Sequence, residues 1–201
     1  MDLSFLWIIF AMADYGVLHS LLASNMVKKS IERQPPAFYA RYYRLIFNIV
    51  GAVTLVPVGL LVYILPDRPL YNIPYPLIII TQLIQAVAGL AAVYVLQGTG
   101  AGAFLGVNQV MGIREEPGRL KTNGFYRYIR HPLYSLSLVI IWLLPWMTVN
   151  RLALIGSATA YLLIGTLFEE RKMLQEFGEE YAQYAARTPM FIPDIRKLPG
   201  R

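Results

Sequence analysis

The sequence predicts an all-α integral membrane protein with about five transmembrane helices, of which the last two form a helical hairpin. The chain has 201 residues, of which 56% are hydrophobic and only 15% are charged, and its mean hydropathy is +0.47. A water-soluble domain of this size carries about 25% charged residues. The hydrophobic residues are also gathered into long runs with few charges. Lipid is therefore the expected solvent for most of the chain.

Five hydrophobic runs are candidates for membrane-crossing helices, because a helix needs about 20 apolar residues to cross about 30 Å of hydrocarbon. The first run contains Asp14 and His19, and no charged residue occurs between Arg68 and Arg114. The last two runs are shorter and are separated by a turn-like segment at residues 148–151, which predicts the hairpin. The five runs are residues 3–23, 45–65, 76–96, 131–150 and 152–168.

Two further segments are expected outside these runs. Four prolines between residues 66 and 76 indicate a loop. After the fifth run, residues spaced by three and four predict a cytosolic amphipathic helix that lies either against the membrane or over a pocket. The residues in this pattern are Glu170, Met173, Leu174, Phe177, Tyr181 and Tyr184.

The basic residues predict the orientation of the chain in the membrane. Of the 18 Lys and Arg residues, 16 lie in residues 28–44, 114–130 and 171–201, and the other two are Arg68 and Arg151. Because basic loops stay in the cytosol, five crossings with the N-terminus outside and the C-terminus cytosolic fit best. The first run has no basic segment before it, so it predicts a retained helix and not a cleaved signal peptide. The net charge of +6 is thus a topology signal, and no nucleic-acid partner is expected.

The composition also excludes several kinds of site. The absence of cysteine excludes disulfides, thiolate metal sites and a cysteine nucleophile. Because the chain has only two histidines, no histidine-rich metal centre is expected. A soluble Rossmann-type nucleotide site needs a Gly-x-Gly-x-x-Gly turn after a strand. Gly98, Gly100 and Gly102 follow a hydrophobic helix with a different spacing, so they indicate a flexible exit from the third run.

A dense set of polar residues leads into the fourth run. Arg130 and His131 precede Pro132, which suits the first turn of a helix because its missing N–H costs nothing there. The free N–H groups and positive dipole of this helix start would suit a carboxylate or a phosphate. The alternative is that these residues only anchor the helix at the lipid headgroups.

A second polar set ends the fifth run. Glu169 and Glu170 are followed by Arg171 and Lys172, so the carboxylates either serve a site or form solvated ion pairs with nearby basic residues. Gly165 lies one helical turn before Glu169, which suggests that another group approaches closely there.

Asp14 and His19 form a third candidate, inside the first run. An intramembrane carboxylate is a functional candidate because it is costly to bury in lipid, so either residue could contact a substrate or relay a proton. The alternative is a structural hydrogen bond to Arg44 or Asn48 on the second helix.

The two C-terminal sets, taken in order, resemble the signature of the isoprenylcysteine carboxyl methyltransferase family. The resemblance covers roughly the last 85 residues. The first half is similar to the bacterial methanethiol S-methyltransferase and NnrU-like branch, through residues 18–24, 43–48, 104–106 with Gln109, and 145–148. The C-terminal match consists of residues 124–126 and 130–134, Glu169, Glu170, Phe177, Gly178, Tyr181, Tyr184 and Pro193.

This resemblance implies a membrane methyltransferase that uses S-adenosyl-L-methionine from the cytosol and a small or lipophilic methyl acceptor from the bilayer. Asp14, His19 and Gln109 are the candidate substrate contacts, the first two because they are polar residues inside the first run. The resemblance implies catalytic roles for Arg130, His131 and Glu170. The cofactor-binding residues that it implies are Gly124, Tyr126, Arg130, His131, Pro132, Tyr134, Glu169, Glu170 and Tyr181. We expect the helix start at Pro132, with Arg130, to receive the methionine carboxylate, and Glu169 or Glu170 to meet the amino or ribose groups.

The same resemblance predicts one domain over residues 1–201, with three membrane helices in 1–97 and the cofactor loop, hairpin and tail in 98–201. The cytoplasmic membrane of a bacterium or archaeon is the expected location. Two alternatives remain, a phospholipid N-methyltransferase and a non-enzymatic membrane protein of the NnrU-like type. Binding of labelled cofactor separates the enzymes from the second alternative.

Overall fold

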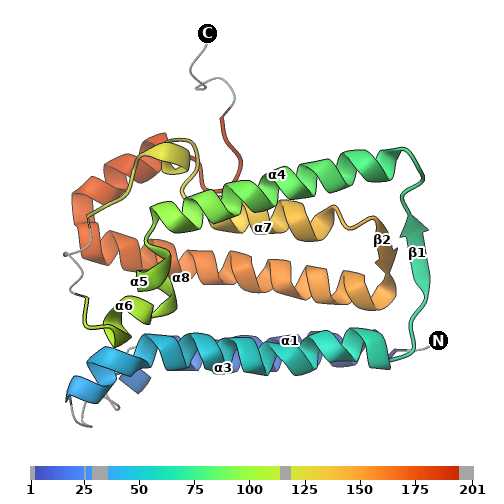
Figure 1. The fold of residues 1–201 in the computed structure, drawn as a ribbon, viewed down its shortest axis with the longest axis horizontal. Coiled ribbons are helices and arrows are strands. Elements are labelled where there is room, and N and C mark those ends of the chain that lie inside the picture. The colour runs from blue at the N-terminus through green and yellow to red at the C-terminus, as the bar shows by residue number, and fades with distance from the viewer. Residues whose placement is uncertain (1–2, 25, 29–35, 114–118, 195–201) are drawn as a thin grey trace. The chain divides into compact units, whose positions relative to one another are not determined.

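The computed structural model describes residues 3–24, 26–28, 36–113 and 119–194, which are predominantly helical (Figure 1). Four helices are long and apolar enough to cross a membrane. The chain divides into two compact units, Met1–Asn72 with Thr99–Glu116 and Trp146–Tyr161, and Ile73–Gly98 with Pro117–Pro145 and Leu162–Arg201. The four long helices are α1 (Phe5–Ala23), α3 (Pro36–Ile64), α4 (Leu77–Gly98) and α8 (Val149–Arg187).

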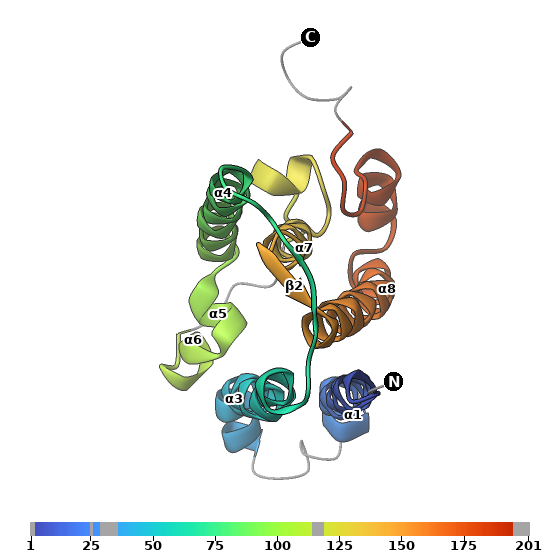
Figure 2. The ribbon, with the colours of Figure 1, turned by 90° about the vertical axis from the view of Figure 1, so that its right-hand side faces the viewer.

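The first unit is built on α1 and α3, which lie side by side (Figure 2). Ile8 and Met12 are the buried residues of α1, while much of the rest of this helix is exposed, as expected for a surface that faces lipid. The short helices α5 (Ala101–Leu105) and α6 (Val107–Val110) pack against α3. They are separated by Gly106, where φ is +86° and a Cβ atom would lie 2.5 Å from the backbone nitrogen of Leu45. Only glycine permits this close approach.

A two-stranded antiparallel sheet joins the end of α3 to the start of α8. β1 (Pro69–Asn72) pairs with β2 (Trp146–Thr148), so the proline-rich segment that was expected to be a loop contains a short strand. The buried Asn150 donates from its side chain to the carbonyls of Leu65 and Pro66. Asp67 accepts from the backbone N–H of Asn150 at 3.0 Å, which satisfies one of the free donors at the start of α8.

The second unit contains α4, the 3₁₀ turn η1 (Gly124–Arg127), α7 (Pro132–Trp142) and the later part of α8. α7 packs along α4, where the Gln85 side chain donates to the carbonyl of Ile140 at 2.7 Å (Figure 1). Pro132 is buried at the first turn of α7, as its fixed φ predicts.

The structure corrects the expected hairpin. The fourth run forms a helix of only 11 residues, which ends at Trp142, and the chain then turns at residues 143–145 instead of at residues 148–151. The expected fifth helix and the amphipathic extension form one element, α8, of 39 residues. Gly178, with φ 54° and ψ −127°, interrupts the helical backbone of α8, so the kink lies within the amphipathic extension, between Phe177 and Tyr181.

Candidate functional site

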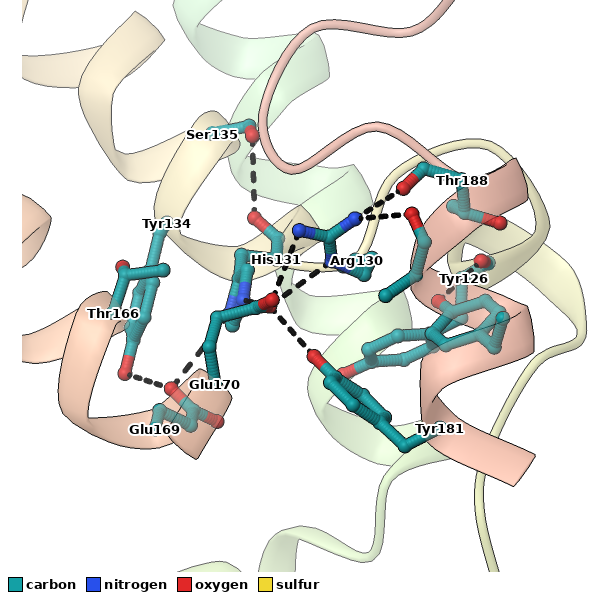
Figure 3. A network of polar contacts seen from close by, with 12 residues as sticks. Tyr126, Arg130, His131, Tyr134, Ser135, Thr166, Glu169, Glu170, Tyr181 and Thr188 are labelled. Atoms are coloured by element: carbon teal, nitrogen blue, oxygen red, sulfur yellow. Dashed lines mark hydrogen bonds and ion pairs between the residues drawn. The ribbon is translucent and has the colours of Figure 1, made fainter. Parts of the chain in front are cut away.

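The two C-terminal polar sets meet in the second unit (Figure 3). Arg130 and His131 come from the segment that enters α7, and Tyr134 lies in its first turn. Glu169 and Glu170 come from α8, just beyond its apolar part, and Tyr181 follows the kink at Gly178. The sets are about 40 residues apart in sequence, so the fold creates this juxtaposition.

Glu170 is the centre of the cluster. Arg130 donates to both of its carboxylate oxygens, from Nε to Oε1 at 3.0 Å and from Nη2 to Oε2 at 2.9 Å. His131 Nε2 and the hydroxyl of Tyr181 each lie 2.6 Å from Oε1. The side chains of Arg130 and Glu170 are only 11% and 17% exposed, so this fork of charge-assisted hydrogen bonds is largely shielded from water.

The surroundings of Glu170 favour its ionised form. Burial raises the pKa of the Glu170 carboxyl, but hydrogen bonds from Arg130, Tyr181 and His131 outweigh burial and leave this pKa below its ordinary value. Burial and the hydrogen bond to the Glu170 carboxylate both raise the pKa of the Tyr181 hydroxyl, which therefore stays protonated and remains a donor. Glu170 is thus a fixed anion with several donors.

Arg130 also holds the end of the described chain. Its Nη1 donates to the carbonyls of Ala185 at 2.8 Å and Thr188 at 2.5 Å, beyond the kink in α8. The backbone N–H groups of Arg130 and His131 donate to the carbonyls of Pro189 and Met190 at 2.9 and 3.1 Å. Both backbone and side-chain hydrogen bonds therefore hold the segment after α8 against the start of α7. We call this segment, residues 188–194, the strap.

Glu169 has a different environment from its neighbour. The Tyr134 hydroxyl donates to its Oε2 at 2.8 Å, and His131 Nδ1 lies 3.7 Å from the same oxygen. Among the described residues, these two are the groups that reach its carboxylate, and its side chain is 44% exposed. The rings of His131 and Tyr134 are stacked, with centroids 5.5 Å apart. Glu169 is consequently a positioned carboxylate that a ligand can still reach.

Gly124 and Tyr126 lie in η1 and line a separate hollow of about 220 Å³ next to α4. Aromatic rings of Tyr94, Phe125 and Tyr126 line it, and Lys121 donates to the carbonyl of Gly98 at its edge. Burial, and then the negative charge of Glu169, raise the pKa of the Tyr126 hydroxyl, so this ring is electrostatically coupled to the cluster.

A larger apolar hollow of about 600 Å³ also lies in the second unit. Ile129 and Ser135 come from either side of Arg130 and His131, and Phe191 comes from the strapped segment. Ser135 and Tyr128 are the lining residues that carry a hydroxyl, and the Ser135 hydroxyl donates to the Phe191 carbonyl at 2.7 Å. This hollow is suited to an apolar chain.

The remaining candidates from the sequence belong to the first unit. Asp14 is exposed on α1, and Gln109 lies in α6, where its Nε2 is 3.5 Å from the Ala103 carbonyl. His19 Nδ1 is hydrogen-bonded to the Tyr161 hydroxyl at 2.7 Å. Asn48 donates instead to the carbonyls of Arg44 and Phe104, and the described residues show no hydrogen bond from Asp14 or His19 to Arg44 or Asn48.

Comparison with known protein families assigns this chain to one of them. A family described as "Protein of unknown function (DUF1295)" matches residues 12–188. The chain belongs to this family. No solved structure matches it significantly.

Curated relatives of this DUF1295 protein include named methyltransferases. It is 37% identical over 91 residues to methanethiol S-methyltransferase 1 of Bradyrhizobium diazoefficiens and 39% identical over 83 residues to methanethiol S-methyltransferase of Pseudomonas deceptionensis. These matches cover 45% and 41% of the chain but only 32% of each relative. It is also 34% identical over 91 residues to protein-S-isoprenylcysteine O-methyltransferase B of Arabidopsis thaliana, which covers 41% of the chain and 43% of that protein. The chain thus spans about a third of the length of the methanethiol enzymes that it matches.

Some residues of the DUF1295 cluster could not be recognised from the sequence. Ala185, Thr188, Pro189 and Met190 contribute backbone carbonyls to Arg130 and His131, and a carbonyl leaves no side-chain pattern. Tyr184 was expected in the amphipathic pattern and in the C-terminal match, without a partner, and its hydroxyl donates to the Tyr126 carbonyl at 2.6 Å. Among the described residues, no group of three or more His, Cys, Asp or Glu side chains could hold a metal ion.

Proposed function

We propose that this protein is an integral-membrane methyltransferase that uses S-adenosyl-L-methionine and transfers its methyl group to a small thiol or a lipophilic acceptor. The observation that carries the proposal is the accessible carboxylate of Glu169, held by Tyr134 next to His131 and coupled to Tyr126. The relatives named methanethiol S-methyltransferase and protein-S-isoprenylcysteine O-methyltransferase support the same chemistry.

The residues of the second unit fit this cofactor. S-adenosyl-L-methionine has an amino acid end that carries an ammonium and a carboxylate, and an aromatic purine end, and it supplies a methyl group on a positively charged sulfur. Glu169 supplies a reachable anion for the ammonium group. The hollow lined by Tyr94, Phe125 and Tyr126 supplies aromatic surfaces for a purine, with Asn123 as a polar neighbour.

Arg130 and Glu170 take positioning roles in this proposal. Arg130 was expected to receive a carboxylate, but its Nε, Nη1 and Nη2 atoms already donate to Glu170 and to two carbonyls. Breaking this fork to bind a ligand would leave Glu170 poorly compensated in a shielded site, which is costly. We therefore assign the pair to holding His131, Tyr181 and the chain after α8 in place around Glu169.

The chemistry that remains for the protein is modest. Methyl transfer from a sulfonium is an in-line displacement with a good leaving group, so catalysis consists mainly of holding the two reactants together and excluding water. Glu169, Tyr134 and Tyr126 hold the cofactor in this proposal, and the strapped segment after α8 helps to exclude water.

The apolar hollow of about 600 Å³ favours an acceptor with an apolar chain as the second candidate. Its lining contains Ser135 as a polar residue among aliphatic and aromatic side chains, so a prenyl or acyl chain would be compatible with it. The same apolar lining is compatible with the acyl chains of a phospholipid, so a phospholipid N-methyltransferase is the alternative activity. A panel of a small thiol, a prenylcysteine and a phospholipid amine, analysed by mass spectrometry for methylated product, identifies the acceptor.

The cofactor assignment is tested by calorimetry of S-adenosyl-L-methionine binding to the purified full chain. We expect the Glu169→Gln variant to bind about tenfold more weakly or worse, because an ionic hydrogen bond is replaced by a neutral one. Glu176→Gln is the matched control, since Glu176 is exposed on the same helix, and it should bind like the wild type. No binding by the wild-type chain, or equal binding by Glu169→Gln and the wild type, would reject the assignment.

A further inference from the structure

Each ring nitrogen of His131 faces a different carboxylate of α8 (Figure 3). Nε2 lies 2.6 Å from Oε1 of Glu170, and Nδ1 lies 3.7 Å from Oε2 of Glu169. The Tyr134 ring is stacked on the imidazole with centroids 5.5 Å apart, and the centroid of the Phe191 ring lies 5.8 Å away. The side chain of His131 is only 6% exposed. Packing therefore holds the imidazole in one orientation between the two carboxylates.

The bond to Glu170 decides which nitrogen of His131 carries the ring proton. The Glu170 carboxyl has a pKa below its ordinary value, so it is ionised at neutral pH and can only accept hydrogen bonds. Arg130 and Tyr181 already donate to the oxygen that faces Nε2. The 2.6 Å contact therefore requires a proton on Nε2. Because a neutral imidazole carries one proton, its Nδ1 then presents a lone pair.

The Nδ1 side of His131 is also the side that a ligand can reach. Glu169, the carboxylate that Nδ1 faces, is 44% exposed, whereas Glu170 is 17% exposed. Among the described residues, none makes a hydrogen bond with Nδ1. In the proposed function an ammonium pairs with Glu169. That pairing leaves Nδ1 as a proton acceptor beside the bound cofactor.

We propose that His131 is a catalytic general base whose Nδ1 takes the proton of a thiol acceptor. The inference rests on the proposed function and narrows its acceptor to a group that has a proton to lose. A thiol such as that of cysteine has a pKa of about 8.5, so it is mostly protonated at neutral pH and is a poor nucleophile in that form. A carboxylate acceptor is already ionised and needs no base. A base next to the cofactor site therefore serves a thiol and not a carboxylate.

In this step Nδ1 accepts the S–H proton, and the electron pair of that bond stays on the acceptor's sulfur as a thiolate. The thiolate forms a new S–C bond with the methyl group while the bond from the methyl group to the sulfonium breaks and its electron pair stays on the cofactor's sulfur. Both sulfurs end as neutral thioethers. The ionised Glu170 stabilises the imidazolium through Nε2, as the carboxylate of a catalytic triad does. Nδ1 then releases its proton to water on the exposed side of Glu169.

Two thiols that differ in acidity test this role in the purified full chain. At neutral pH ethanethiol is protonated, whereas para-nitrothiophenol is already a thiolate and needs no base. His131→Gln keeps an N–H group for Glu170 but has no basic nitrogen. At saturating S-adenosyl-L-methionine, we expect this variant to lose about 100-fold more of its kcat/KM with ethanethiol than with para-nitrothiophenol.

The comparison of two thiols separates a base from a residue that only positions the cofactor. A change in cofactor position alone lowers both rates equally, so it cancels from the ratio of the two losses. Glu176→Gln is the control variant, because Glu176 is exposed on α8, and it should leave both rates unchanged.

Nitrogen NMR of the histidine-labelled protein without cofactor gives an independent readout of the ring. The chain has only two histidines, so removing either one assigns the signals. When the His131 ring is neutral, we expect its proton on Nε2 and not on Nδ1. A proton on Nδ1 of the neutral ring, equal losses with the two thiols, or cofactor binding without methylation of either thiol would overturn this inference alone. A wild-type chain that binds no S-adenosyl-L-methionine would reject the proposed function and this inference with it.

Discussion

Glu169 and Glu170 are adjacent in the sequence, yet the fold gives them different tasks. Successive side chains on a helix point about 100° apart, so one carboxylate can be enclosed while the next is open. Glu170 is 17% exposed and accepts from Arg130, His131 and Tyr181, whereas Glu169 is 44% exposed. The sequence shows that the pair exists. It cannot show which member faces residues 130–134, because tertiary packing sets the rotation of α8.

Replacing Arg130 by lysine tests whether the shape of the guanidinium group is needed in addition to its positive charge. Arg130→Lys keeps the positive charge but loses the planar fork, because an ammonium cannot reach both Glu170 oxygens and the carbonyls of Ala185 and Thr188 together. We expect a loss of about 2 kcal/mol in the local stability of the strap. Hydrogen exchange at the amides of residues 130 and 131, which donate to Pro189 and Met190, measures this loss.

The control for this substitution is Arg187→Lys, at an exposed arginine at the end of α8 that donates to the carbonyl of Gln183. Its exchange at residues 130 and 131 should match that of the wild type. Unaltered exchange in Arg130→Lys would show that the charge alone holds the segment.

The lowered pKa of Glu170 predicts acid sensitivity of the same strap. Because the folded pKa lies below the ordinary value of 4.5, the ionised carboxylate stabilises the fold at neutral pH. This contribution is lost as the pH falls from the ordinary value through the folded pKa. Exchange at residues 130 and 131, corrected for its intrinsic pH dependence, should therefore rise in the wild type below about pH 4.5.

Glu170→Gln separates this effect from other titrating groups. The variant should show fast exchange already at neutral pH and little further change on acidification, because the group that titrates is absent. Glu176→Gln should follow the wild type. A Glu170→Gln profile parallel to that of the wild type would show that another carboxyl controls the strap.

At the scale of elements, apolar run length predicted α1, α3 and α4 well, because each must supply enough apolar residues to cross the hydrocarbon. It overestimated the helix at residues 131–150, where α7 ends at Trp142 and β2 follows. That difference arises from pairing between β2 and β1, and strand pairing between distant segments leaves little local pattern in three or four residues. Gly165 was expected to permit a close approach, but no atom lies within 4 Å of a Cβ at this position.

The kink in α8 can be tested by replacing Gly178, with Gly165 of the same helix as the control position. Gly178 has φ 54° and ψ −127°, a conformation that residues with a side chain rarely adopt. Gly178→Ala should therefore cost about 1–3 kcal/mol or straighten the helix, which would move Tyr181 away from Glu170. Gly165→Ala, in a regular part of α8 with space for a methyl group, should be neutral or slightly stabilising.

Thermal unfolding in detergent, followed by circular dichroism, measures the stability of both glycine variants. Cofactor binding by calorimetry then reports whether Tyr181 has lost its place. A stabilising effect of Gly178→Ala without loss of binding would show that the kink is not needed to close the cluster.

At the scale of the whole chain, pairing of β1 with β2 bears on the number of crossings. β1 lies between α3 and α4, so residues 146–148 share a side of the membrane with the loop that contains Arg68. α7 spans only about 16 Å at 1.5 Å per residue, but an extended segment adds about 3.3 Å per residue. The helix and the three residues of β2 together account for about 26 Å, and the turn at residues 143–145 between them leaves a crossing of about 30 Å within reach.

This arithmetic predicts five crossings, with the N-terminus outside and the C-terminus in the cytosol. A green fluorescent protein fused after Arg201 should fluoresce, and alkaline phosphatase at the same position should be inactive, because each reporter matures on only one side of the membrane. Alkaline phosphatase fused after residue 72 should be active. If α7 instead returned to the side from which it entered, the tail would lie outside with its six basic residues, the C-terminal reporters would reverse, and the excess of Lys and Arg would no longer follow the cytosolic side.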